Sequence, residues 1–191
     1  MIGKPPETVP DNLTGEEYYQ LGTWYLDLGQ IEQGRISLQR ATEQNVDLEA
    51  AKRAKIMLAC RMPATEIPKE AVERCDKVRM TGFSNPAEAA RTYEELISQY
   101  PKFERPYKRL AELRLTEGNV AKCVELLESV LKINPNYAPA MDVMAHALAA
   151  NMDYDNAFRF LQQAIDLIPE TERAQLLDFR RSLQIAAAME S

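Results

Sequence analysis

The residues of this chain that could take part in catalysis or metal binding are few and widely spaced. The only histidine, His146, has no cysteine or second histidine near it in the sequence, so it does not complete a metal-ligand motif. Cys60, Cys75 and Cys123 are 15 and 48 residues apart and contain no C-x-x-C pair. Neither a zinc site nor a disulfide framework is therefore predicted. Motifs for phosphate binding, dinucleotide binding and nucleophilic catalysis are also missing, so we predict neither an enzyme nor a cofactor.

The balance of charge argues against nucleic acid as a partner. The 191 residues include 23 basic and 29 acidic side chains, which gives a formal net charge of −6. Phosphate binding draws on a surplus of Lys and Arg along one face. The charge is uneven, because residues 1–50 hold three basic and nine acidic side chains and residues 51–85 hold eight and four. We therefore predict a protein or peptide partner. The basic segment between acidic ends either contacts a partner or only reduces the self-repulsion of the chain.

The sequence contains no membrane-spanning segment. Residues 1–13 are polar, include three prolines and lack the apolar stretch of a signal peptide, so a flexible N-terminus is predicted. A run of about 18 apolar residues, which a spanning helix needs, does not occur anywhere in the chain. The odd number of unclustered cysteines favours a reducing compartment. We predict a cytoplasmic protein, unless a signal was removed from it earlier.

A repeat with a period of 34 residues organises the C-terminal half. Pro101, Pro135 and Pro169 are each 34 residues apart, and an amphipathic stretch precedes each of them. The apolar residues in these stretches recur every three or four positions, which is typical of one face of a helix. They are Ala89, Tyr93, Leu96 and Ile97, then Cys123, Leu127, Val130 and Leu131, then Ala157, Leu161, Ala164 and Ile165.

In these positions the chain resembles the tetratricopeptide-repeat family, whose pattern is W-x2-L-G-x2-Y, then A-x3-F, then P. The N-terminal copy of the pattern is Tyr18, Leu21, Gly22, Tyr25, Gly34, Leu38 and Ala41. Two later copies contain Tyr107, Leu110, Ala111, Cys123 and Leu127, and Met141, Met144, Ala145, Leu148, Ala157 and Leu161. The resemblance implies helix pairs that cross closely at the small residues and stack into a continuous core.

The predicted fold is all-α, a tetratricopeptide-repeat superhelical solenoid of antiparallel helix pairs with an irregular helical insertion and a C-terminal capping helix. After the flexible residues 1–13, residues 14–191 form a single repeat domain. Its parts are a repeat at 15–48, an irregular helical insertion at 49–69, a degenerate repeat at 70–103, repeats at 104–137 and 138–171, and a capping helix at 172–190.

Residues at the expected helix ends agree with this register. Thr14 with Glu17, and Asn85 with Glu88, are predicted capping boxes. Gly29, Gly118 and Asn151 stand where first helices should end, because these residue types tolerate a left-handed conformation. Between Asn45 and Asn85 the repeat pattern is lost, and we predict two helices near 48–61 and 67–80. The last helix is predicted to start at Thr171 and to bury Leu176, Phe179, Leu183 and Ala186.

The resemblance also implies a binding surface, because first helices of the family line the inner groove in which extended peptides bind. The residues that fall on this face here are Tyr19, Thr23, Arg105, Lys108, Glu112, Asp142, His146, Arg173 and Arg180. Arg105 and Lys108 are expected to be exposed, and the cations on this face favour an acidic partner. The chaperone-tail clamp of one subgroup is not expected, because Glu112, Val143 and Leu177 replace its two asparagines and its last arginine.

The leading hypothesis is a non-enzymatic scaffold that binds a peptide or protein in the groove and helps to assemble a larger complex. The alternative is a homo-oligomer in which the basic residues 51–85 of one copy dock on the acidic N-terminal repeat of another. An enzyme with an unusual site in the insertion is a third hypothesis, which no motif supports.

Overall fold

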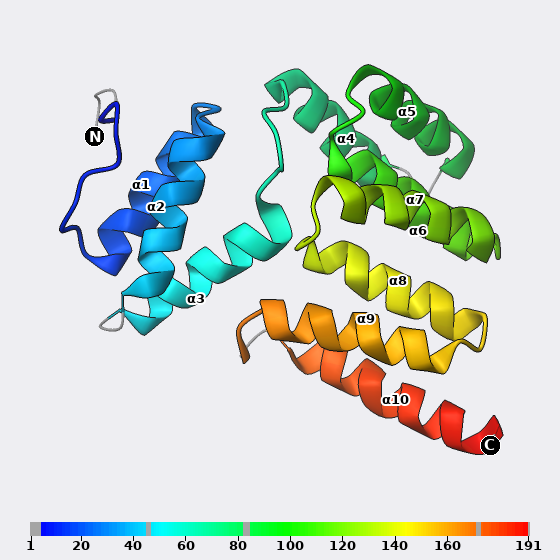
Figure 1. Cartoon of the computed structure of the whole chain (residues 1–191). Coiled ribbons are helices and arrows are strands. Elements are labelled where there is room, and N and C mark those ends of the chain that lie inside the picture. The colour runs from blue at the N-terminus through cyan, green and yellow to red at the C-terminus, as the bar shows by residue number, and fades with distance from the viewer. Residues whose placement is uncertain (1–4, 45–46, 82–84, 171–172, 191) are drawn as a thin grey trace. The chain divides into compact units, whose positions relative to one another are not determined.

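The computed structural model describes residues 5–44, 47–81, 85–170 and 173–190, and all regular elements within them are helical. The fold is the predicted all-helical repeat solenoid (Figure 1). The chain forms two compact units, residues 1–66 and 67–191, and each is described by itself. Among the described residues, no helix combines the length and apolar character that crossing a membrane requires.

The first unit contains one helix pair and a closing helix. Helix α1 (Gly15–Asp27) and helix α2 (Ile31–Glu43) form the pair. Helix α3 (Leu48–Ile56) follows and continues into a π-helical segment, Met57–Arg61. The helix expected near 48–61 is thereby confirmed. The buried core of this unit consists of Tyr18, Leu38, Ala41, Ala54 and Met62. Trp24, the only tryptophan of the chain, lies half-buried on α1.

Two glycines allow α1 and α2 to cross closely. A Cβ atom added at Gly22 would lie 2.8 Å from Cγ of Leu38, and one added at Gly34 would lie 2.7 Å from Cδ2 of Leu26. The carbonyl oxygens of the two glycines also lie within 3.3 Å of these added atoms. The signature positions for small residues are therefore filled by glycine because the opposite helix occupies the space of a side chain.

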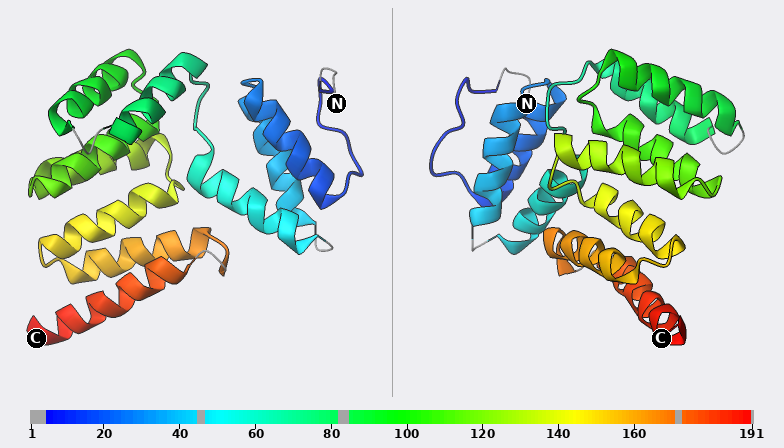
Figure 2. Two further views of the ribbon diagram at one scale, coloured as in Figure 1. Left: turned by 180° about the vertical axis from the view of Figure 1, so that it is seen from behind. Right: turned by 45° about the vertical axis from the view of Figure 1, so that its right-hand side comes forward.

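The second unit is a stack of helix pairs. Its helices are α4 (Lys69–Thr81), α5 (Pro86–Gln99), α6 (Glu104–Thr116), α7 (Val120–Ile133), α8 (Ala138–Ala150), α9 (Tyr154–Leu167) and α10 (Ala174–Glu190). The helix expected near 67–80 is confirmed as α4. Figure 2 shows α8, α9 and α10 as successive neighbours in both views.

Helix α10 covers the end of the stack, as the sequence predicts for the last helix. Leu183 is 3% exposed and joins the buried cluster of Ala145, Ala157 and Leu161. Phe179 packs partly buried against the same cluster. The predicted start at Thr171 lies outside the described residues.

Most of the predicted helix ends are confirmed. Thr14 and Glu17 form a complete capping box at the start of α1. At α5 the side chain of Asn85 accepts the predicted bond from the backbone N–H of Glu88. The return bond differs, because the Asn85 side-chain amide, and not its backbone, donates to the Glu88 carboxylate over 2.8 Å.

Helix α8 ends before its C-cap residue Asn151, as predicted, but the prediction that this residue is left-handed is wrong. Gly29 and Gly118 have φ angles of 75° and 76°, as expected for residues that follow a first helix. Asn151, by contrast, has φ −99° and the left-handed conformation falls on Met152, with φ 60°. The physical reason is register: Met152 lies 34 residues after Gly118 and so occupies the same turn position.

Candidate protein-binding surfaces

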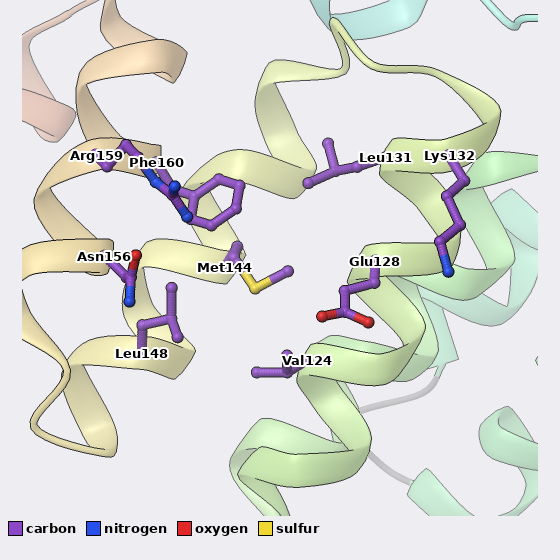
Figure 3. A pocket seen from close by; sticks show the side chains of 9 residues that line it. All are labelled: Val124, Glu128, Leu131, Lys132, Met144, Leu148, Asn156, Arg159 and Phe160. Carbon is purple, nitrogen blue, oxygen red and sulfur yellow. The ribbon is translucent and has the colours of Figure 1, made fainter.

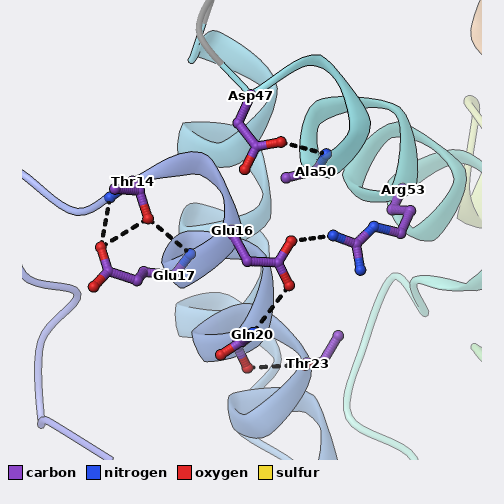
Figure 4. A network of polar contacts seen from close by, with 8 residues as sticks. All are labelled: Thr14, Glu16, Glu17, Gln20, Thr23, Asp47, Ala50 and Arg53. Carbon is purple, nitrogen blue, oxygen red and sulfur yellow. Dashed lines mark hydrogen bonds and ion pairs between the residues drawn. The ribbon is translucent and has the colours of Figure 1, made fainter.

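The first-helix face of the first unit is partly covered by α3 (Figure 4). Arg53 of α3 forms a hydrogen-bonded ion pair with Glu16 of α1, and its guanidinium lies 4.3 Å from the ring centroid of Tyr19. Gln20 donates to Glu16 over 2.9 Å, and the Thr23 hydroxyl donates to the backbone oxygen of Gln20. Tyr19 and Thr23, two predicted groove residues, are half-buried beside this network.

The three predicted groove residues on α6 are already engaged in ion pairs. Nζ of Lys108 lies 2.5 Å from Oε1 of Glu112, and Nη1 of Arg109 lies 2.9 Å from Oε2 of the same carboxylate. Arg105 pairs with Asp76 of α4 over 3.6 Å. The expectation that Lys108 is exposed is wrong, because its side chain is only 12% exposed. Its long aliphatic part can be covered while the ammonium group keeps a carboxylate partner.

Helices α8 and α10 meet at the predicted groove residues Asp142 and His146. The imidazole of His146 stacks on the ring of Phe179 of α10, with centroids 3.7 Å apart and planes 7° apart. Its Nδ1 lies 3.0 Å from the backbone oxygen of Asp142 and 3.4 Å from its carboxylate. The hydrogen bond to the Asp142 side chain raises the pKa of His146, and burial opposes this effect in part.

The last two predicted residues bond to groups at α9 and its C-terminal end. Nε of Arg173 donates to the backbone oxygen of Ile168 over 3.0 Å, and Nη1 of Arg180 donates to Oε1 of Gln162 over 3.1 Å. Lys108 with Glu112 and Asp142 with His146 are thus the predicted groove residues that contact one another. Their role in binding a partner stays a prediction.

The sequence analysis did not predict a groove in the second unit, which lies on the side formed by the second helices of the repeats. It has a volume of about 630 Å³ and lies between α7 and α9, with Met144 and Leu148 of α8 at its base (Figure 3). Its apolar walls include Leu131 and Phe160, and Glu128, Lys132 and Arg159 are the charged residues among its lining. The guanidinium of Arg159 lies 5.2 Å from the ring centroid of Phe160.

One sequence signal could have indicated this groove. Val124 and Leu131 on α7, and Phe160 on α9, are apolar residues beside the signature positions and not in them. All three are only partly buried and line the groove. Helix periodicity identifies the buried stripe of a single helix, but it does not report a gap between two helices.

The cysteines of this chain are free thiols, and two of them lie inside the second unit. Burial raises the pKa of Cys75 and of Cys123 to about 11 in each case. Such thiols remain protonated at neutral pH, and the thiolate is the reactive form. These two residues therefore act as small apolar side chains of the core.

Comparison with known proteins identifies the family of this chain. A family model described as a tetratricopeptide repeat matches residues 82–152, and a second model of the same description matches residues 18–45. The chain belongs to the tetratricopeptide-repeat family. No curated protein matches the sequence.

Two solved structures resemble this one at low sequence identity. The tetratricopeptide-repeat domain of P58(IPK) is 17% identical, with a TM-score of 0.55, and the match covers 96% of this chain. This chain spans 48% of the length of that domain. PilF of Pseudomonas aeruginosa is 18% identical, with a TM-score of 0.48, and 92% of this chain and 87% of PilF are covered. These likenesses concern the fold alone.

Proposed function

We propose that this protein is a non-enzymatic scaffold that binds a peptide or protein partner along the first-helix face of its repeats and helps to assemble a larger complex. The observation that carries this proposal is the repeat architecture itself. Stacked first helices place polar side chains from different repeats on one face, where an extended ligand can contact several of them. The tetratricopeptide-repeat fold supports a protein-interaction role.

The predicted preference for an acidic partner rests mainly on three arginines. Arg105, Arg173 and Arg180 project from α6, from the residue before α10 and from α10, in a chain with a net charge of −6. Within the described part of the chain, Arg180 bonds to the neutral side chain of Gln162, and Arg105 pairs with the carboxylate of Asp76 over 3.6 Å. A carboxylate of a ligand can therefore compete for these two guanidinium groups, with screening by salt over about 8–10 Å.

Affinity capture from the native cell tests this proposal. The bait proteins are the natural chain, the double variant Arg105→Glu/Arg180→Glu, and the control Arg181→Glu. Arg181 is 76% exposed and pairs with Asp178 of the same helix, and it is not one of the predicted groove residues, so its reversal alters net charge without altering the proposed face. We expect the control to retain the natural partner and the folded double variant to lose it. Equal capture by all three proteins would contradict the proposal.

The self-assembly hypothesis receives less support from the ion pairs. Four basic residues of the segment 51–85 already pair with acidic groups of the same chain: Lys52 with Glu49, Arg53 with Glu16, Lys69 with Glu73 and Arg74 with Glu95. A second copy would have to replace these partners. Light scattering across protein and salt concentration distinguishes the two hypotheses, because a protein that stays monomeric at high concentration and low salt is no homo-oligomeric scaffold.

We propose a cytoplasmic location from the sequence, because an odd number of unclustered cysteines favours a reducing compartment.

A further inference from the structure

Residues 5–13, here called the N-terminal strap, pack against the helix pair of the first unit. Pro5 is buried, and Val9 and Leu13 pack on the cluster that contains Tyr18 and Leu38. In Figure 1 the strap is the dark blue segment beside α1. The sequence predicts a flexible segment here, since most of its residues are polar or proline. The contacts described next are made to its backbone, which such a pattern does not reveal.

Three side chains of α1 and α2 donate hydrogen bonds to carbonyl groups of the strap. The Tyr25 hydroxyl donates to Pro6 over 2.8 Å, and the Tyr18 hydroxyl donates to Pro10 over 3.2 Å. Nη1 of Arg40 donates to the carbonyl oxygens of Pro10, at 2.8 Å, and Val9, at 3.3 Å. Every residue of any chain offers a carbonyl acceptor, so these donors recognise an extended backbone more than a particular sequence.

A few side chains of the strap add selectivity. Asp11 pairs with Arg40 at 2.9 Å, although its side chain is 81% exposed. Pro6 and Pro10 have a fixed φ angle, which favours an extended conformation before binding and lowers the entropy lost on binding. The surface of α1 and α2 thus has the properties of a receptor for an extended, proline-containing segment in which an acidic residue follows the last proline, as Asp11 follows Pro10.

We infer that this surface is a binding site for such a segment of a partner protein, and that the strap occupies it in the isolated chain. The inference goes beyond the proposed function, because Tyr18, Tyr25 and Arg40 are not among the residues of the first-helix face proposed above. Glu7, Thr8 and Asp11 are exposed, so the outer edge of the bound segment is open to solvent. The tether gives the strap a high effective concentration, and a partner must therefore compete with it.

The test uses a chain without residues 1–11 and a fluorescently labelled peptide of the sequence of residues 5–13, PPETVPDNL. We expect saturable binding of the peptide to the shortened chain, measured by fluorescence anisotropy. The complete chain should bind at least about tenfold more weakly, because its own strap competes. Arg40→Leu in the shortened chain should also weaken binding at least about tenfold, since it removes a charge-assisted bond. Arg35→Leu is the matched control, because Arg35 lies on α2 and bonds to Pro63 and Glu32 instead.

Each outcome decides the inference. A shortened chain with unchanged helical content that does not bind the peptide overturns it. If deletion of the strap reduces the helical circular dichroism signal, the added peptide should restore this signal, and failure to restore it also overturns the inference. A complete chain that dimerises, with a dimer that dissociates when residues 1–11 are removed, would assign the surface to the strap of a second copy and would contradict binding of a different protein.

Discussion

The same small-residue positions are filled differently in the two units. In the first unit Gly22 and Gly34 let α1 and α2 approach until a single added carbon would collide with a leucine of the opposite helix. In the second unit Ala145 and Ala157, both 0% exposed, take these positions between α8 and α9. The repeat pattern therefore permits either glycine or alanine at these positions. At each crossing the two helices pack closely around the residue that is present, so that no space is left for a larger one. The units also differ in extent, since the first has one helix pair and the second has several pairs beneath α10.

The largest loss of stability and solubility is expected when α10, the last helix of the second unit, is removed. Deletion of residues 171–191 uncovers the cluster of Ala157 and Leu161, and the loss of Leu183 alone removes about 2 kcal/mol of apolar burial. We expect a polydisperse, aggregating protein in size-exclusion chromatography with light scattering. Deletion of residues 186–191 is the control, because it keeps Leu183 in place and should leave the protein monodisperse. A monodisperse protein after the longer deletion would show that α10 is no cap.

Ala157→Leu should lower the free energy of unfolding by about 1–3 kcal/mol, because added methylene groups have no space at a packed helix crossing. Thermal unfolding followed by circular dichroism measures the effect. Ala150→Leu is the control, since Ala150 is an exposed residue at the end of α8. An unchanged midpoint for Ala157→Leu would mean that the register of the repeats is wrong.

Gly22→Ala is the corresponding variant in the first unit, and it should lower the free energy of unfolding by a smaller amount than Ala157→Leu. The new Cβ atom meets Leu38, which is 0% exposed and has little freedom to move. Replacing a glycine within a helix also gains about 1 kcal/mol of helix propensity, which offsets part of the collision. We expect a lower midpoint for the first unit, measured by tryptophan emission. An increase in stability would show that this crossing has more room than the distances indicate.

A variant in the turn that follows the first helix of a repeat should have a smaller effect and should raise the free energy of unfolding. Met152 has φ 60° and is 65% exposed, so Met152→Gly should stabilise the second unit by about 1 kcal/mol. Gly118→Met places the same side chain in the equivalent turn and should destabilise by a similar amount. Denaturant titration measures both variants. Equal shifts in the same direction would show that backbone conformation is not the cause.

The smallest expected effect concerns pH. Because the pKa of His146 is raised above 6.5 in the folded chain, its protonated form contributes stability below pH 6.5, and this contribution is lost as the pH rises through the folded pKa. The side chain is 46% exposed, so solvent screening should keep the effect below about 1 kcal/mol. As His146 is the only histidine, an NMR titration of its ring protons gives the pKa directly. Asp142→Asn should bring that pKa closer to 6.5, and a pKa that does not respond would exclude Asp142 as the cause.

The sequence predicted what depends on local spacing. The capping box of Thr14 and the buried Leu183 follow from spacings of three or four residues within one helix. Features that depend on distant contacts were not predicted. Arg40 bonds to the strap across 30 residues of sequence, and the low exposure of the Lys108 side chain, 12%, was not expected from its place on the polar face of its helix. The groove beside Phe160 likewise depends on the separation of two helices, which periodicity does not encode.

The position of Trp24 makes the two units separable by spectroscopy. This single tryptophan lies on α1, so its emission reports the environment of the first unit alone. The far-ultraviolet circular dichroism of the chain comes mainly from the second unit, which contains seven of the helices in the described residues. One sample followed with both signals therefore yields two unfolding curves. Coincident curves would indicate cooperative unfolding of the whole chain, and separate curves would give the stability of each unit without cutting the polypeptide.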